Sequence, residues 1–328
     1  MKFLVVGLGS MGKRRIRCLK KLGYNDIFGF DTRNDRLIES VEKYAIQSVV
    51  DLNEFNFDLI EAIVVSTPPD KHQQYMELSI EKNKPCFVEA SVIIDGLERI
   101  NKKAKEKNVL IAPSCTFFFH PIISEIIEIV NSGKYGKVTN FTYHSGQYLP
   151  DWHPWENVKD FYVSNRTTGG AREIVPFELT WITKMLGFPL SVKGCFAKTM
   201  DIGADIEDTY CFIMKYEDML GAVTVDVATR YATRNLILNL EYAQITWKWD
   251  DGMFSLYDVR KKRWIRYHQP EDIAEPGYNK NIVEGFYIQE VQNFIDAING
   301  LKEFPNNLDE DIKVLEFLKH IEDSDGGF

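Results

Sequence analysis

The feature that most constrains this chain lies at its start, where an apolar run leads directly into three closely spaced glycines. Residues 3–6 read Phe-Leu-Val-Val, and Gly7, Gly9 and Gly12 follow in the pattern G-x-G-x-x-G. In such a turn the first glycine permits a tight bend, the second lets the backbone approach a phosphate, and the third lets the next helix pack closely on the strand. The spacing therefore predicts a strand, a phosphate-binding turn and a helix.

The turn predicts binding of a dinucleotide, because the amides at the start of the helix attract a pyrophosphate. Asp31 follows the last glycine by 19 residues, close to the spacing of about 20 at which an acid binds the ribose hydroxyls. A carboxylate there favours NAD, while the neighbouring Thr32 and Arg33 leave NADP as an alternative. The cofactor-binding residues predicted in this part of the chain are Gly7, Gly9, Ser10, Met11, Gly12, Asp31, Thr32 and Arg33.

The chain divides into two regions with different patterns. Residues 1–120 alternate short apolar runs with amphipathic stretches, which predicts a doubly wound parallel Rossmann sheet of α/β type. From residue 121 onward, longer alternating runs rich in β-branched and aromatic residues predict an α+β domain with a large open, mostly antiparallel sheet. We expect a dinucleotide-binding domain at 1–120 and a substrate-binding domain at 121–328, with a late helix returning to pack on the first domain or on the sheet.

Composition excludes several partners. The net charge of the 328 residues is −9, so the chain lacks the basic surface that nucleic-acid binding requires. No run reaches the roughly 18 apolar residues of a membrane span, and the chain opens with a strand rather than a signal peptide, so we expect a cytoplasmic protein without membrane contact. The histidines show no pairing with acids at metal-ligand spacing, and no metal site is predicted.

Six short motifs follow one another in a specific order. They are G-L-G-S-M-G-K-R-R at 7–15, S-T-P-P-D-K-H at 66–72, F-V-E-A-S at 87–91, F-H-P at 119–121, S-G-K-Y-G-K-V at 132–138 and T-G-G-A-R-E at 168–173. In this order they resemble the Gfo/Idh/MocA family, the NAD(P)-dependent oxidoreductases named after glucose-fructose oxidoreductase and inositol dehydrogenase. The resemblance spans nearly the whole chain. It implies hydride exchange at a sugar or polyol carbon and a homodimer or homotetramer formed through the open sheet.

The resemblance also implies further contacts to the cofactor. The matching residues are Ser66, Thr67, Pro68, His72 and Glu89. The first three would line the adenine and ribose side, His72 would lie near the dinucleotide, and Glu89 would match the glutamate of the family's E-K-P motif. The chain departs from the family at two places. Ala90 stands where the family has the lysine that assists proton transfer, and the D-x-x-x-H sequence after the double glycine is absent.

The missing lysine leaves the proton carrier open. Hydride transfer at a carbinol carbon requires a group that takes or gives the hydroxyl proton. Glu173 directly follows the Gly-Gly-Ala-Arg segment that borders the substrate in the family, and His153 lies in a segment rich in aromatic residues. Glu178 follows Pro176 near the start of a predicted helix, where it could equally be a favourable first-turn acid. The predicted catalytic residues are Glu173, His153 and Glu178.

Substrate-binding candidates cluster near residue 150. Trp152 and Trp155 offer flat faces to the C–H side of a sugar, and Gln147 offers hydrogen bonds to hydroxyls; alternatively, the tryptophans anchor a long loop. His120 would lie at the end of a strand near the nicotinamide, with structural and functional roles equally open. Arg172 could pair with an anionic group of the substrate.

These residues favour an NAD(H)-dependent oxidoreductase that acts on a sugar or nucleotide-sugar hydroxyl or ketone with a non-standard acid/base set. Two other functions stay open. Some proteins of this fold hydrolyse glycosides by transient oxidation and elimination with NAD bound throughout, and some members of the family bind the cofactor and regulate partners without catalysis. Ala90 keeps the last alternative open.

Overall fold

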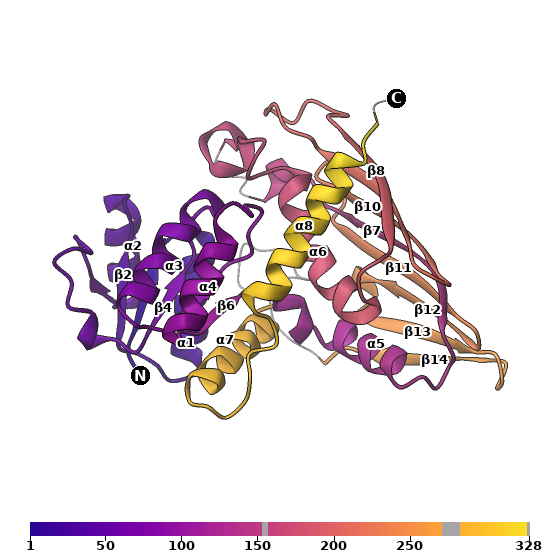
Figure 1. Ribbon diagram of the computed structural model, residues 1–328, viewed down its shortest axis with the longest axis horizontal. Helices are drawn as coiled ribbons and strands as arrows, with labels where there is room; N and C mark the ends of the chain where they lie inside the picture. Colours follow the sequence, from indigo (N-terminus) through magenta and orange to yellow (C-terminus); the bar gives the residue numbers. More distant parts are fainter. Residues whose placement is uncertain (153–156, 271–282, 327–328) are drawn as a thin grey trace. The chain divides into compact units, whose positions relative to one another are not determined.

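The computed structural model describes residues 1–152, 157–270 and 283–326, and these residues form two compact units. The first unit contains Met1–Phe119 together with residues 283–313. The second contains the described residues of 120–270 and 314–326. A segment late in the sequence therefore folds with the N-terminal residues (Figure 1).

The first unit is built on a six-stranded parallel sheet with the order β3-β2-β1-β4-β5-β6. Its strands are β1 (Phe3–Val6), β2 (Ile27–Phe30), β3 (Gln47–Ser48), β4 (Ala62–Val65), β5 (Cys86–Val88) and β6 (Ile111–Pro113). The strand order reverses between β1 and β4, and doubly wound sheets bind ligands at such a switch point, outside the carboxyl ends of the strands. The predicted Rossmann sheet is confirmed.

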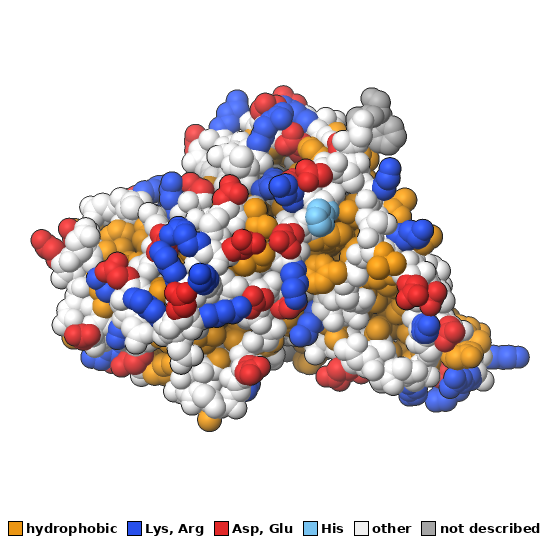
Figure 2. All heavy atoms as spheres, in the orientation of Figure 1, with side chains coloured by type: hydrophobic (Ala, Val, Ile, Leu, Met, Phe, Trp, Pro, Cys, Tyr) orange, Lys and Arg blue, Asp and Glu red, His pale blue; other side chains and the backbone are white. Residues whose placement is uncertain are grey.

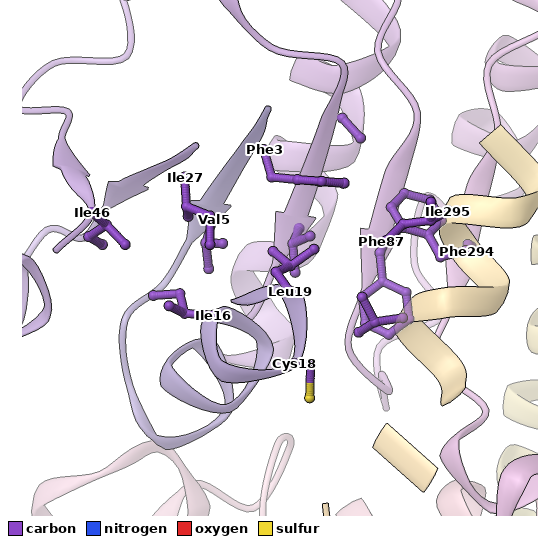
Figure 3. Close-up of a cluster of buried hydrophobic side chains, with 14 of the residues drawn as sticks. Phe3, Val5, Ile16, Cys18, Leu19, Ile27, Ile46, Phe87, Phe294 and Ile295 are labelled. Atoms are coloured by element: carbon purple, nitrogen blue, oxygen red, sulfur yellow. The ribbon is translucent and has the colours of Figure 1, made fainter. Parts of the chain in front are cut away.

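Helices of the first unit cover this sheet. They are α1 (Ser10–Lys21), α2 (Asn34–Tyr44), α3 (His72–Glu81), α4 (Leu97–Lys107) and α7 (Gly285–Ile298). Helix α1 turns Ile16 and Leu19 towards the buried strand β1, because apolar residues spaced by three or four positions share one helix face. The rings of Phe87 on β5 and Phe294 on α7 lie 5.7 Å apart. Figure 3 shows both side chains in the same core. Helix α7 thus completes the core of the dinucleotide-binding fold.

The second unit contains an eight-stranded sheet with the order β14-β13-β12-β11-β7-β10-β9-β8. Its strands are β7 (Val138–Gly146), β8 (Ser191–Ala197), β9 (Thr209–Lys215), β10 (Leu220–Asp226), β11 (Thr233–Leu240), β12 (Ala243–Lys248), β13 (Met253–Asp258) and β14 (Arg263–His268). Strands β7 and β10 pair in parallel, and the other neighbours pair antiparallel. The predicted open, mostly antiparallel sheet is confirmed.

Helices lie on one face of this sheet (Figure 1). They are α5 (Pro121–Asn131), α6 (Ala171–Leu186) and the part of α8 (Leu308–Asp323) that follows residue 313. Side chains alternate along the strands, so that Tyr143 and Leu236 are buried under the helices while Ile213 and Ile237 point to the other face. That open face carries exposed apolar residues, Ile213 at 55% and Ile237 at 46% of their full exposure.

Two surface properties bear on possible partners. Within the described ranges, none of the helices combines the length and apolar character that crossing a membrane requires. On the face drawn in Figure 2, Lys and Arg side chains lie among Asp and Glu side chains. This face therefore offers no continuous basic surface to a phosphate backbone.

Candidate functional site

The three glycines form a turn at the carboxyl end of β1. Gly7 has a φ of +87°, a conformation that glycine adopts without steric cost. A Cβ at Gly7 would lie 2.6 Å from the carbonyl oxygen of Ser66, and a Cβ at Gly12 would lie 1.8 Å from that of Gly7. A Cβ at Gly9 would meet only the guanidinium of Arg36, at 3.4 Å. The first and third glycines are thus required by the backbone, whereas the second leaves the turn accessible.

The turn opens into the N-terminus of α1. Gly9 is the N-cap residue and provides no capping side chain, and the first turn of the helix contains no acid. A helix that begins in this way attracts anions through its amides and its dipole. We call the turn formed by Gly7, Gly9 and Gly12 the glycine cradle. The glycine cradle and the uncapped helix together fit the pyrophosphate of a dinucleotide.

Asp31 follows β2, and backbone amides hold its carboxylate. Oδ2 accepts a hydrogen bond from the N–H of Leu8 at 2.7 Å, and Oδ1 accepts one from the N–H of Arg33 at 2.8 Å. The first bond ties Asp31 to the glycine turn. Each oxygen keeps a second lone pair, so the carboxylate can still accept hydrogen bonds from ribose hydroxyls. The guanidinium of Arg33 pairs with Asp35 at 2.6 Å, and both side chains are exposed.

His72 binds the segment that follows β4. Its Nε2 lies 2.8 Å from the carbonyl oxygen of Thr67, and burial lowers the pKa of the ring, so that the neutral imidazole donates to this carbonyl. Thr67 Oγ1 and His72 Nδ1 are buried, and neither has a hydrogen-bond partner among the described residues. The Ser66 hydroxyl donates to Glu89 at 3.2 Å. The structure thus brings together the predicted residues that follow β4 and β5.

In the second unit, Glu178 lies in the core. Its carboxylate is fully buried and accepts hydrogen bonds from Tyr143 Oη at 2.7 Å, Ser145 Oγ at 2.8 Å, Trp181 Nε1 at 2.9 Å and Arg234 Nε at 2.8 Å. Four donors use the acceptor capacity of both oxygens. Glu178 therefore ties α6 to β7 and β11 and offers nothing to a substrate hydroxyl, which corrects our expectation of a catalytic role.

Glu173 has a different environment in the first turn of α6. Its Oε1 accepts a hydrogen bond from Tyr162 Oη at 2.6 Å, and its Oε2 is buried with no partner among the residues that the structure describes. Burial raises the pKa of this carboxyl to about 7, although the Tyr162 hydrogen bond lowers it. The group can therefore both accept and donate a proton near neutral pH. Tyr162 has no motif in the sequence that would have identified it.

Arg172, which we predicted to bind an anionic group, is engaged within the second unit. Its Nε donates to Glu322 on α8 at 2.7 Å, and its Nη1 donates to the carbonyl oxygen of Thr167 at 2.7 Å. These bonds hold the start of α6 against the C-terminal part of α8. The geometry gives Arg172 a structural role instead.

His120 belongs to an aromatic cluster. Its ring lies 5.6 Å from that of Trp247 and 5.5 Å from that of Trp249, and the guanidinium of Arg234 stands 4.2 Å above the Trp249 ring. Burial, together with the nearby charge of Arg234, lowers the pKa of His120 to about 3. The imidazole is therefore neutral at physiological pH, and it can contribute hydrogen bonds and packing but no charge.

The remaining substrate candidates lie on the segment after β7. The backbone N–H of Gln147 donates to the carbonyl oxygen of Asp226 at 3.1 Å. Gln147 itself is half-buried. Trp152 is half-buried too, and its Nε1 has no partner within the described ranges. His153 and Trp155 lie outside the described residues. No group of three or more His, Cys, Asp or Glu side chains in the described parts of the chain could hold a metal ion.

Comparison with known proteins identifies a family that the first unit resembles. Residues 1–114 match the family model GFO_IDH_MocA, described as an oxidoreductase family with an NAD-binding Rossmann fold. The N-terminal residues thus resemble the Gfo/Idh/MocA family. The family resemblance and NAD as the cofactor are thereby confirmed. No curated protein matches the chain.

Several solved structures share the fold over 99% of this chain. GenD2 from gentamicin A biosynthesis, in complex with NAD, has a TM-score of 0.80 at 17% identity, with 93% of that chain covered. Levoglucosan dehydrogenase, in complex with NADH, has a TM-score of 0.83 at 13% identity, with 96% covered. UDP-N-acetylglucosamine 3-dehydrogenase GnnA from Acidithiobacillus ferrooxidans has a TM-score of 0.78 at 13% identity, with 97% covered. These similarities extend the shared fold to the second unit.

Proposed function

We propose that this protein is an NAD(H)-dependent oxidoreductase that acts on a hydroxyl or ketone of a sugar or nucleotide sugar, with Glu173 as the proton carrier. The observation that carries this proposal is the state of the Glu173 carboxyl. One oxygen is oriented by Tyr162, the other is buried without a partner among the described residues, and the pKa is raised to about 7. Proton transfer is most efficient when the pKa of the acid or base lies near the working pH.

The chemistry follows from this arrangement. The glycine turn and Asp31 would hold NAD⁺, which would supply the acceptor for the hydride that leaves the carbinol carbon. Oε2 of Glu173 takes the hydroxyl proton, so that the alcohol becomes a ketone and the carboxylate becomes a carboxylic acid. In the reverse direction the protonated carboxyl returns its proton to the ketone oxygen. Tyr162 keeps the carboxyl in one orientation by donating to Oε1.

A sugar substrate is supported by two kinds of evidence. Proteins of the same fold include levoglucosan dehydrogenase and UDP-N-acetylglucosamine 3-dehydrogenase. In this chain, Trp152 offers an aromatic face, and Gln147 and the neutral His120 offer hydrogen-bonding groups. We infer that these three residues contact the sugar, and His153 and Trp155 stay predictions.

We infer that NAD is preferred over NADP. The carboxylate of Asp31 is fixed at the glycine turn by Leu8, where it would repel a 2′-phosphate. Arg33, the nearest cation in sequence, is already paired with Asp35. Thr32 is exposed and adds no charge.

We further infer that the open face of the second unit's sheet pairs with another copy of the chain to form a homodimer or homotetramer. Exposed Ile213, Leu220 and Ile237 lie on this face, and large apolar side chains gathered on one surface mark association sites. Light scattering of the purified protein should show a dimer or tetramer. Ile213→Lys and Ile237→Lys together should release monomers, and a monomeric wild-type protein would exclude this interface.

The function is tested with a panel of sugars and nucleotide sugars in the presence of NAD⁺. Net formation of NADH with at least one of them is expected. Release of a sugar from a glycoside without net NADH would instead establish the glycoside hydrolase. Tight NAD binding without turnover on either panel would establish the non-catalytic regulator. Either of these two outcomes would overturn the proposal.

A further inference from the structure

Three charged side chains meet inside the first unit, and we call them the Arg15 triad. Arg15 on α1 donates from Nε and Nη2 to the two oxygens of Glu89, at 2.6 and 2.8 Å, and from Nη1 to Glu290 on α7 at 2.8 Å. The side chains of Arg15 and Glu290 have no exposed surface, whereas Glu89 keeps 13% of its own. Glu89 is therefore the member of the triad that solvent or a ligand can reach.

Four hydrogen-bond donors surround Glu290. Its carboxylate accepts from Arg15, from the Ser114 hydroxyl at 2.9 Å, from the N–H of Cys115 at 2.6 Å and from the Thr116 hydroxyl at 2.8 Å. These donors use the acceptor capacity of the carboxylate, which counts as one formal negative charge in the triad.

Glu89 and Arg15 are the other two members of the triad. Glu89 receives both bonds of the Arg15 fork and a further bond from the Ser66 hydroxyl. Burial by itself would lower the pKa of Arg15, but Glu89 and Glu290 outweigh it and hold that pKa above its ordinary value. One guanidinium therefore faces two carboxylates. Ala90 and Ser91, the next residues after Glu89, add no positive charge.

A second charged cluster joins the same two helices. Glu284 accepts from Arg14 at 3.2 Å and from Arg17 at 2.6 Å, so this cluster carries one net positive charge. The Tyr287 ring lies between the two clusters, 4.3 Å from the Arg14 guanidinium carbon and 5.4 Å from that of Arg15. The Arg14 cluster is thus a neighbour of the triad.

The triad lies at the part of the sheet that serves the nicotinamide half of the cofactor. Asp31 follows β2, on the adenosine side of the switch point between β1 and β4. In a doubly wound fold the two halves of a dinucleotide lie on opposite sides of this point. The nicotinamide half therefore belongs over the ends of β4 and β5, where Ser66 and Glu89 meet. Ser66 then lies on the nicotinamide side and not on the adenine side to which the family resemblance assigned it.

We propose that Arg15 and Glu290 are positioning residues that hold Glu89, with one net negative charge, beside the nicotinamide half, and that the triad thereby favours the oxidised cofactor over the reduced one. The nicotinamide ring is positively charged in NAD⁺ and neutral in NADH. A fixed negative charge therefore attracts the oxidised ring and does little to the reduced ring. This inference rests on NAD binding at the glycine cradle and is independent of the proposed sugar chemistry.

The test compares the dissociation constants of NAD⁺ and NADH, measured by calorimetry on the purified full chain. Glu290→Gln removes the excess charge and should weaken NAD⁺ relative to NADH by about tenfold, the size expected for one charge about 10–12 Å away at an effective dielectric near 20. Glu284→Gln is the matched control, because it removes the same charge from the residue just before the same helix, outside the triad. The ratio of the two constants should shift by a clearly smaller factor, because Glu284 pairs with Arg14 and Arg17 rather than with the arginine that holds Glu89.

Two more variants separate charge from structure. Ala90→Lys neutralises the triad from outside without breaking a bond, and it should shift the ratio in the same direction even if Glu290→Gln does not fold. Thr116→Val removes one donor from Glu290 and no charge, and it should change both constants by the same factor. Equal weakening of NAD⁺ and NADH by both Glu290→Gln and Ala90→Lys, or an unchanged ratio in both, would overturn the proposal.

Discussion

Removing the Tyr162 hydroxyl should raise the pKa of the Glu173 carboxyl. The hydroxyl donates to Glu173 Oε1 at 2.6 Å and stabilises the charged form, which opposes the increase in pKa that burial causes. The Tyr162→Phe change keeps the ring and removes only this donor. If Glu173 is the proton carrier, the pH at which alcohol oxidation becomes active must follow its pKa.

The size of the shift follows from the strength of the bond. A hydrogen bond to a charged group contributes about 1.5–3 kcal/mol, and one pKa unit corresponds to about 1.36 kcal/mol. The pKa should therefore rise from about 7 by about 1–2 units. A water molecule that takes the place of the hydroxyl would bring the shift to the lower end of this range.

The assay is the pH dependence of kcat/KM for NADH formation at saturating NAD⁺. Oxidation requires the ionised carboxylate, so the rate should rise with pH through a midpoint near 7 in the wild-type enzyme and through a midpoint about 1–2 units higher in Tyr162→Phe. The plateau at high pH should be reduced much less than the rate at neutral pH. A midpoint that stays in place or moves to lower pH would refute the assignment of Glu173.

Other predictions address stability and cofactor binding. Burial raises the folded-state pKa of Glu173 to about 7, so the protonated carboxyl stabilises the fold at about pH 4, and this stabilisation is lost as the pH rises through about 7. The free energy of unfolding of Glu173→Gln, measured with denaturant, should therefore rise by about 1–3 kcal/mol relative to that of the wild type between these pH values. Parallel pH curves for the two proteins would contradict this. Gly12→Ala should lower NAD affinity by about tenfold or more and reduce the melting temperature, since its Cβ would lie 1.8 Å from the Gly7 oxygen, and normal calorimetric binding would exclude the cradle as the site. Asp31→Ala should weaken NAD more than NADP in the same assay, and equal losses would undo the ribose assignment.

The glycine turn and the two sheets could be predicted from the sequence because their signals are local. Gly12 is required by its close contact with Gly7 inside the turn and Gly7 by its positive φ, and the spacing of the glycines reports this turn; the further contact of Gly7 with Ser66 after β4 carries no local signal. The alternation of apolar residues likewise reports which strand face is buried. Helix α7 folds with the first unit through core contacts such as Phe87–Phe294, and nothing in its own periodicity identifies that partner.

The candidate site was harder to predict because its partners come from distant segments. Glu178 looked like a first-turn acid, but its donors lie on β7 and β11 as well as on its own helix, and they bury it completely. Arg172 was predicted to face a substrate, but it pairs with Glu322, 150 residues further along the chain. Glu290 carried no motif at all, because its role depends on Arg15, which lies at the opposite end of the sequence.

The most direct test of the central claim is NADH formation by wild-type protein and Glu173→Gln with the sugar that the panel identifies, alongside calorimetric NAD binding. Asp160→Asn is the matched control, since it removes an exposed carboxylate two residues before Tyr162. Our account predicts that Glu173→Gln loses turnover while its NAD affinity stays within a few fold, and that Asp160→Asn keeps both. Full turnover by Glu173→Gln would contradict the account.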